Sequence, residues 1–215
     1  MQALRANPLG HNNLILNLKS VLFLTQTTPN KMPNQDAKTV DYSFLGIVTI
    51  KDAVDLEKEE HDSSKILTHK ERRLLRINTV NFSANKIVQI NDLPISLTLL
   101  QLSPTNIKWL DLSNNKISSL ENAFETFDNL TVLYLHANEI SSIKAIKPLE
   151  KLKKLTSLTL HGNPIEEQKH FRNYTMYLLP TLEKLNFSLI TNRDREKCKT
   201  WSSLFRNKLS NQSND

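Results

Sequence analysis

The side chains of this 215-residue chain that could bind a metal are two histidines at matching positions of a repeated segment. His136 follows L-Y-L and His161 follows L-T-L, so the two rings would lie on neighbouring strands. Protein zinc sites use three or four ligands. The remaining candidates are Asp111, which falls on a different row of side chains, and Cys198, which falls on a C-terminal helical stripe. We therefore expect no metal and no cofactor.

The sequence also contains no set of residues typical of a catalytic site. The single cysteine, Cys198, lies among apolar residues at helical spacing, and a buried thiol is inert rather than nucleophilic. Glu166 and Glu167 follow Pro164 at a predicted helix start, where the helix dipole favours carboxylates. Gly-rich phosphate loops, HExxH and CxxC motifs are absent, and the chain has only three glycines. The sequence predicts a protein that is not an enzyme and has no small-molecule substrate.

The strands that carry the two histidines belong to a pattern that occurs three times between Ile107 and Ile165. The copies read I-K-W-L-D-L-S-N-N-K-I, L-T-V-L-Y-L-H-A-N-E-I and L-T-S-L-T-L-H-G-N-P-I. Each fits L-x-x-L-x-L-x-x-N-x-L, the leucine-rich repeat template. Such a unit, one strand and one return segment, buries its apolar side only against a similar neighbour. A degenerate first copy and a terminal strand carry the remaining template residues: Ile77, Val80, Phe82, Asn85, Ile87 and Ile90, then Leu182, Leu185 and Phe187.

This pattern predicts an α/β fold: a leucine-rich repeat solenoid of about five repeats, with a parallel sheet on its concave face and a C-terminal helical cap. The asparagine of each repeat turns the chain off its strand. Buried amides need hydrogen-bond partners, so we expect a ladder in which each amide bonds to backbone groups of its own and the next coil. Residues 91–105 must form a longer return segment or bulge. The ladder residues are Asn85, Asn115, Asn138 and Asn163.

Side chains alternate between the two faces of a strand, which gives the outward-facing residues of the concave surface. Adjacent strands lie about 4.8 Å apart, so neighbouring outward residues should converge into one patch. An exposed tryptophan and tyrosine side by side are typical of interface anchors. The alternative is that N-terminal residues fold back over them. The predicted protein-binding residues are Trp109, Asp111, Tyr134, His136, Thr159 and His161.

The flanks of the repeats divide into three segments. Residues 1–40 form an extension, irregular or docked on a partner, and residues 41–76 form a flanking or capping segment before the repeat domain at 77–190. The apolar run Leu14–Leu24 is interrupted by polar residues and too short to span a membrane. The extension is similar to a mitochondrial transit peptide in lacking acidic residues up to Asp36, and Met32 is an alternative start. We favour a disordered or partner-docked extension.

Residues 191–215 are predicted to form the cap helix and tail. Thr191-Asn-Arg-Asp194 fits a capping box, in which residues at the helix start satisfy each other's backbone N–H groups. An apolar helical stripe follows and should cover the open end of the solenoid core, with docking to a partner as the alternative. The stripe consists of Cys198, Trp201, Leu204, Phe205 and Leu209.

Composition restricts the partner and the compartment. The net charge of +6 comes from the two ends, residues 1–40 and 186–215, while the middle is neutral. Basic ends on a neutral body favour an acidic protein partner over nucleic acid. One cysteine cannot form an internal disulfide, which indicates a reducing compartment, the cytoplasm.

The repeats resemble the intracellular, cysteine-free Sds22-like class. They are more specifically similar to the family of leucine-rich repeat-containing protein 51, through Asp41-Tyr-Ser-Phe44, W-L-D-L-S, F-D-N-L-T-V-L-Y-L-H-A-N and L-T-S-L-T-L-H-G-N-P-I-E-E. The resemblance implies a non-enzymatic structural or adaptor protein that binds other proteins in the axoneme of motile cilia. Two alternatives stay open: a regulatory subunit of a protein phosphatase and a ribonucleoprotein component.

Overall fold

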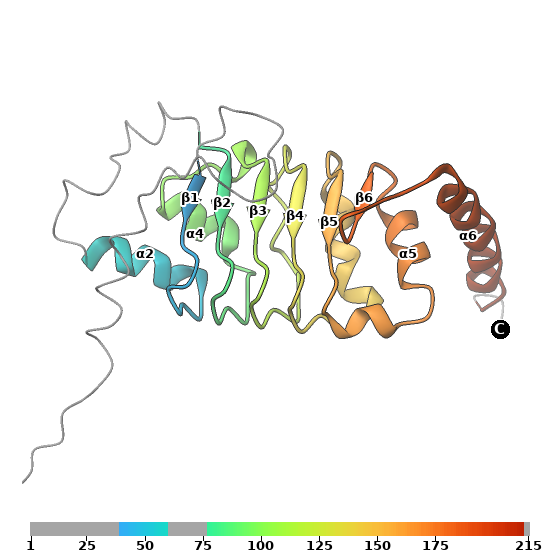
Figure 1. Ribbon diagram of the computed structural model, residues 1–215, viewed down its shortest axis with the longest axis horizontal. Coiled ribbons are helices and arrows are strands. Elements are labelled where there is room, and N and C mark those ends of the chain that lie inside the picture. The colour runs from blue at the N-terminus through green and yellow to red at the C-terminus, as the bar shows by residue number, and fades with distance from the viewer. Residues whose placement is uncertain (1–38, 60–76, 213–215) are drawn as a thin grey trace, which may run out of the picture.

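The computed structural model describes residues 39–59 and 77–212, with side chains described for residues 39–58 and 77–204. In this part of the chain one sheet runs in the order of the sequence (Figure 1). Its strands are β1 (Thr39–Asp41), β2 (Thr79–Asn81), β3 (Trp109–Asp111), β4 (Val132–Tyr134), β5 (Ser157–Thr159), β6 (Lys184–Leu185) and β7 (Ser188–Leu189). Neighbours from β1 to β6 are parallel, and β7 is antiparallel to β6.

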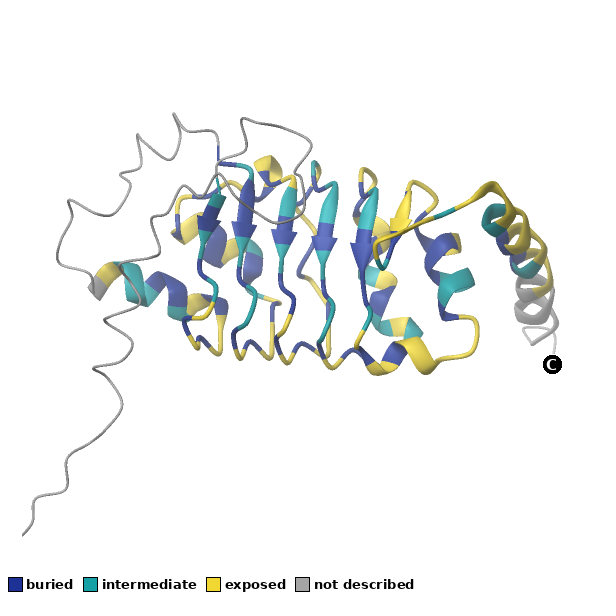
Figure 2. Cartoon of the chain, viewed as in Figure 1, coloured by how far each residue is buried: buried dark blue, intermediate teal, exposed yellow. Residues whose placement is uncertain are grey.

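The repeats stack in phase, as the template predicts. Val80, Leu110, Leu133, Leu158 and Leu185 lie opposite one another on consecutive strands, and all five are buried. Figure 2 shows the buried residues following the strands and the inner faces of the return segments. Because each coil covers the apolar side of the one before it, the core is continuous along the solenoid.

Return segments on the far side of the sheet are helical, except the one between β3 and β4, which is built from turns. The inserted stretch 91–105 forms α4 (Leu93–Leu99) and η2 (Pro104–Asn106), so it is a helical return segment packed through Leu93 and Leu97. The other helices are α2 (Ile50–Glu59), η3 (Ile143–Lys151), η4 (Pro164–Glu167), α5 (Phe171–Leu178) and α6 (Asn192–Gln212). The η elements are 3₁₀ helices.

The predicted asparagine ladder is present, with one correction. Asn115 Oδ1 accepts the Ile87 N–H at 3.0 Å, and its Nδ2 donates to the carbonyls of Phe82 at 3.0 Å and Leu112 at 3.1 Å. Ile87 and Phe82 belong to the preceding coil, not the following one, because the amide points along the solenoid axis toward the N-terminal end. Asn85, Asn138 and Asn163 repeat this arrangement.

The sheet begins earlier than the predicted boundary at residue 77. β1 pairs in parallel with β2, and the Tyr42 ring stacks on Phe82 with centroids 5.0 Å apart. Phe44 has φ of 59°, the left-handed conformation that Ala84 adopts at φ 56° before the ladder residue Asn85. This coil carries Leu45 where later coils carry the asparagine. Within the described residues no coil precedes it, so an amide at this position would have no preceding coil to bond. The coil lacks the residue that identifies a repeat.

The predicted capping box is confirmed at the start of α6. The buried part of the predicted apolar stripe is smaller than expected. Asp194 Oδ2 accepts the Thr191 N–H at 3.0 Å, and the Asp194 N–H donates to Thr191 Oγ1 at 3.2 Å. The hydrogen bonds that its carboxylate accepts from the Thr191 N–H and the Thr191 hydroxyl, together with Arg172, lower the pKa of Asp194 to about 2. Cys198 is buried, whereas Leu204, expected to cover the core, is 64% exposed. The reason is that α6 packs against α5, so only its α5-facing residues are covered.

Trp201 lies in that helix contact. Its ring centroid is 6.2 Å from that of Tyr177 on α5 and 5.7 Å from that of His170. The Phe205 and Leu209 side chains lie outside the described residues, as do the extension up to residue 38 and residues 60–76. Among the helices described, none is long and apolar enough to cross a membrane.

Candidate protein-binding face

Aromatic side chains gather on the sheet face, over strands β3 to β6. The ring centroids of Trp109 and Tyr134 lie 5.3 Å apart in an edge-to-face arrangement. Tyr134 lies 6.0 Å from His136, which stacks in parallel on His161 at 4.6 Å and 7°. The structure thus brings together the predicted residues Trp109, Tyr134, His136 and His161. With Phe187, described next, these residues form what we call the aromatic cluster.

Phe187 belongs to this cluster, although the repeat pattern placed it in the core. Its side chain is 51% exposed, and its ring centroid lies 5.5 Å from those of Tyr134 and His161 and 6.0 Å from that of His136. Asn186 and Phe187 have φ of 52° and 63°, so the chain reverses tightly between β6 and β7 and swings the ring over the sheet. Left-handed backbone at phenylalanine is unusual.

The turn that carries Phe187 is fixed by Asn186. Its Oδ1 accepts the N–H groups of Leu160 at 2.7 Å and His161 at 3.1 Å, and its Nδ2 donates to Glu166 Oε1 at 2.9 Å. Asparagine at the first position of a two-residue hairpin is a recognised turn signal. That signal, in Leu185-Asn-Phe-Ser188, could have identified the turn from the sequence.

Thr159 is not an exposed contact residue, contrary to the prediction. It is fully buried, and its Oγ1 lies 2.9 Å from His136 Nδ1 and accepts the Leu135 N–H at 3.3 Å. Threonine is short, so the larger rings around it close over its hydroxyl. Its role is to orient the His136 ring from below.

Burial favours the uncharged form of His136, one of the two stacked histidines. Burial lowers the pKa of His136, and the neighbouring His161 lowers it further. The Nδ1 atom of His161 is buried with no hydrogen-bond partner in the described part of the chain. Burial therefore favours the neutral form of the His136 ring in this stack. Within residues 39–59 and 77–204, no group of three or more His, Cys, Asp or Glu side chains is placed to hold a metal.

The other end of the sheet face carries a polar row, Asp41, Asn81 and Asp111. Each side-chain Oδ1 accepts the backbone N–H two residues ahead, from Ser43 at 2.9 Å, Ser83 at 2.9 Å and Ser113 at 2.8 Å. Burial raises the pKa of Asp111, the bonds from Ser113 oppose the rise, and the Asp41 carboxylate adds to it. Asp111 thus sits beside Trp109 and Tyr134, as predicted, but its carboxylate is engaged by its own chain.

Cys198 shows no sign of activation. Its thiol donates to the Asn173 carbonyl at 3.3 Å, and burial raises its pKa, which keeps it protonated at neutral pH. The nucleophilic form of cysteine is the thiolate, so this residue acts as part of the α5–α6 packing.

Comparison with known proteins places this geometry among leucine-rich repeat proteins. A family model described as "Leucine-rich repeat" matches residues 63–214. Leucine-rich repeat-containing protein 51 of Bos taurus is 34% identical over 162 residues, which cover 75% of this chain and 83% of the bovine protein. The Homo sapiens protein of the same name is 33% identical over the same shares.

A second group of relatives is more distant. U2 small nuclear ribonucleoprotein A′ of Candida albicans is 28% identical over 122 residues, 56% of this chain and 49% of that protein. A chain in the crystal structure of the Drosophila melanogaster SNF/U2A′ complex superposes with a TM-score of 0.55 and 22% identity, covering 82% of this chain and 87% of that one. At that identity the likeness concerns the fold alone.

Proposed function

This chain belongs to the leucine-rich repeat proteins and, within them, to the family of leucine-rich repeat-containing protein 51, and on that premise we propose that it is a non-enzymatic adaptor. Its sheet face binds a segment of another protein within a larger assembly. That assembly is the axoneme of motile cilia, reached from the cytoplasm.

The observation that supports this proposal is the aromatic cluster. Trp109, Tyr134 and Phe187 present rings toward solvent from a sheet whose backbone the asparagine ladder holds in place. Large rings with only two side-chain torsions contribute contact area at low entropic cost. Tryptophan and tyrosine are also the residues most enriched among interface positions that dominate binding energy. A rigid frame that presents such rings is suited to holding a helix or an extended strand.

The chemistry of the cluster favours a partner segment with an apolar face. His136 favours its neutral form, because burial lowers its pKa. Tyr134 also stays uncharged, since burial raises its pKa and the Asp111 carboxylate adds to that. Neither group needs to lose a charge when a partner covers it, so the desolvation cost of binding is small.

The ciliary assignment rests on the family. The resemblance to leucine-rich repeat-containing protein 51 extends to the D-Y-S-F segment at β1 and to H-G-N-P-I-E-E after β5, which lie partly outside the generic repeat. The family implies a structural or adaptor role in ciliated cells, and a protein-binding sheet face is the feature that such a role requires.

The experiment compares two variants in ciliated cells. Trp109→Ala with Tyr134→Ala removes two rings that point away from the core, so the fold should persist. We expect loss of several kcal/mol of partner affinity if these are dominant contacts, seen as loss of the protein from salt-washed axonemes. Phe44→Ala is the matched control, because Phe44 is an aromatic residue 72% exposed at the other end of the sheet. Equal retention of both folded variants would contradict the proposal.

A ribonucleoprotein role is the second candidate, favoured by the similarity to U2 small nuclear ribonucleoprotein A′. The sheet face argues against direct RNA contact, since Asp41 and Asp111 would repel phosphates there. A protein partner within such a particle would still fit the aromatic cluster. Nuclear location, together with a steep salt dependence of RNA binding by the particle, would favour this candidate.

A further inference from the structure

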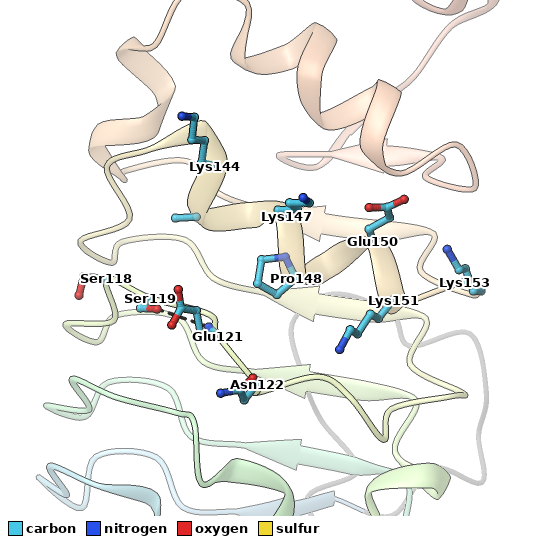
Figure 3. A pocket seen from close by; sticks show the side chains of 11 residues that line it. Ser118, Ser119, Glu121, Asn122, Lys144, Lys147, Pro148, Glu150, Lys151 and Lys153 are labelled. Atoms are coloured by element: carbon cyan, nitrogen blue, oxygen red, sulfur yellow. Dashed lines mark hydrogen bonds between the residues drawn. The ribbon is translucent and has the colours of Figure 1, made fainter. Parts of the chain in front are cut away.

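A cleft opens on the side of the molecule opposite the sheet, between the coils that follow β3 and β4 (Figure 3). Its volume is about 710 Å³. The segment from Ser118 to Asn122 forms one wall, and η3 with the following Lys153 forms the other. None of these residues contributes to the aromatic cluster, so this cleft is separate from the proposed function.

The 3₁₀ geometry of η3 sorts its residues into rows. In a 3₁₀ helix, residues three apart lie above one another. Ile146 and Leu149 are buried in the core, and the partly buried Ile143 packs against it. The next row, Lys144, Lys147 and Glu150, is exposed. The same spacing that anchors the helix therefore lines up two lysines along the cleft, and Figure 3 shows them on the η3 wall.

Positive charge in the cleft is only partly neutralised. Four lysines line it, against the two carboxylates of Glu121 and Glu150. Lys151 pairs with Glu125 at 2.6 Å. Among the residues that the structure describes, Lys144, Lys147 and Lys153 form no ion pair. With Glu121, Glu150 and Glu125 counted against the four lysines, the cleft keeps a net positive charge, which attracts carboxylates.

The cleft surface beside the lysines is apolar and suits a peptide. Ala145 and Pro148 are partly buried and form an apolar strip along η3 beside the lysines. Lysine is a point charge on a flexible stem, so it selects negative charge rather than one fixed geometry. Glu121 and Glu150 would repel a nucleic acid, whose backbone carries a negative charge at every unit. A peptide can carry its carboxylates opposite the lysines and uncharged residues opposite the two glutamates.

We propose that the cleft lined by Lys144, Lys147, Lys151 and Lys153 is a second binding site, which takes an acidic peptide segment of a protein partner. The aliphatic part of the segment packs on Ala145 and Pro148, and its aspartate or glutamate side chains pair with the lysines. The chain then has two independent contact faces, one aromatic and one basic, as an adaptor requires.

The test uses the full chain and a fluorescent peptide in which glutamate alternates with glycine, followed by anisotropy. The glutamine counterpart of the peptide should not bind. Lys144→Gln with Lys147→Gln should weaken binding on the order of tenfold at low salt, because two ion pairs are lost. Lys51→Gln with Lys184→Gln removes the same charge elsewhere and should leave affinity within about twofold. Glu150→Gln should tighten binding.

Three results would overturn the proposal. Equal weakening by both lysine pairs would mean that the peptide responds to overall charge. Equal binding of the glutamine peptide would remove the role of carboxylates. Tighter binding of a duplex DNA oligonucleotide, lost in the Lys144 and Lys147 variant, would make the cleft a nucleic-acid site. All three readouts are independent of the aromatic cluster, so the proposed function can fail or stand without them.

Discussion

The two halves of the sheet face share one backbone frame and differ in what their outward side chains do. In the N-terminal half, Asp41, Asn81 and Asp111 each accept the N–H two residues ahead, so their polar atoms are used to hold the chain at the strand end. In the C-terminal half, Tyr134 and His136 occupy the outward positions, and these rings pack on one another instead.

This difference separates stabilising residues from recognition residues. A side chain that is hydrogen-bonded to its own turn has little left to offer a partner. The rings of the aromatic cluster leave apolar surface exposed, most clearly at Phe187, which is 51% exposed. A contiguous apolar patch of this kind on a stable frame is typical of an interaction site.

The largest expected effect comes from breaking the frame that both halves share. Leu135 is fully buried beneath the sheet. Leu135→Asp places a charge in the core without a partner, and we expect destabilisation by several kcal/mol and loss of cooperative folding. Thermal unfolding followed by circular dichroism measures this. A melting temperature within a degree or two of the wild type would mean that the repeat register is wrong.

Removing one ring from the C-terminal half should affect binding far more than folding. Phe187→Ala takes away a half-exposed ring that contacts three members of the cluster. We expect a near-normal melting temperature and a loss of about 2 kcal/mol or more of affinity for the sheet-face partner. Titration of the partner segment by calorimetry gives the affinity. An unchanged affinity would place the contact outside the C-terminal half.

In the N-terminal half of the sheet face, a substitution that removes a charge should increase the stability of the fold. Burial raises the pKa of Asp111, so the folded state binds a proton more tightly than the unfolded chain. The charged carboxylate therefore costs stability at neutral pH, and this cost is relieved as the pH falls through the folded pKa. Asp111→Asn keeps the oxygen that accepts from Ser113 and removes the charge. We expect a gain on the order of 0.5–1 kcal/mol at neutral pH.

The control for this prediction is the pH dependence of the stability gained by Asp111→Asn. The difference between Asp111→Asn and wild type should shrink as the pH falls toward about 4, the ordinary aspartate range. A less stable variant at neutral pH would mean that a cation from outside the described residues pairs with the wild-type carboxylate.

The smallest effect is expected at the histidine stack. The pKa of His136 is lowered in the fold, so its contribution to stability is present above the unfolded value and is lost as the pH falls through about 6.5 toward the folded pKa. His136→Phe keeps a ring beside His161 and removes this titration. Denaturant unfolding between neutral and mildly acidic pH should show a shallower loss of stability for the variant. Identical slopes would show that His136 does not titrate in this range.

Repetition is what made most of the fold predictable. Strands β2 to β5 follow one template, so Asn115, Asn138 and Asn163 identified both the register and the buried ladder. The coil that follows β1 escaped detection because it has Leu45 at the position where the later coils carry asparagine. Leu204 was misplaced because helical spacing gives the apolar side of α6 but not the width of its contact with α5.

The candidate site was predicted less completely, for reasons of side-chain size and turn geometry. Alternation placed Thr159 on the outward face, but the surrounding rings cover a residue so short. Phe187 was assigned to the core because a repeat pattern cannot indicate that the last strand reverses at Asn186 and Phe187. Trp109 and Tyr134 lie on the sheet face, as alternation predicted, because the central repeats have neighbours on both sides, which fix their strands.

Site-specific photo-cross-linking in ciliated cells tests the central claim most directly. A benzophenone amino acid would replace Phe187 in the aromatic cluster, Asn81 in the polar row, or Ile95, which is 68% exposed on α4. If the C-terminal half of the sheet face holds a protein segment, the probe at position 187 should give one discrete protein adduct, lost in the Trp109→Ala, Tyr134→Ala background. The other two positions should give little. An adduct at position 95 or 81 with none at 187 would contradict the account.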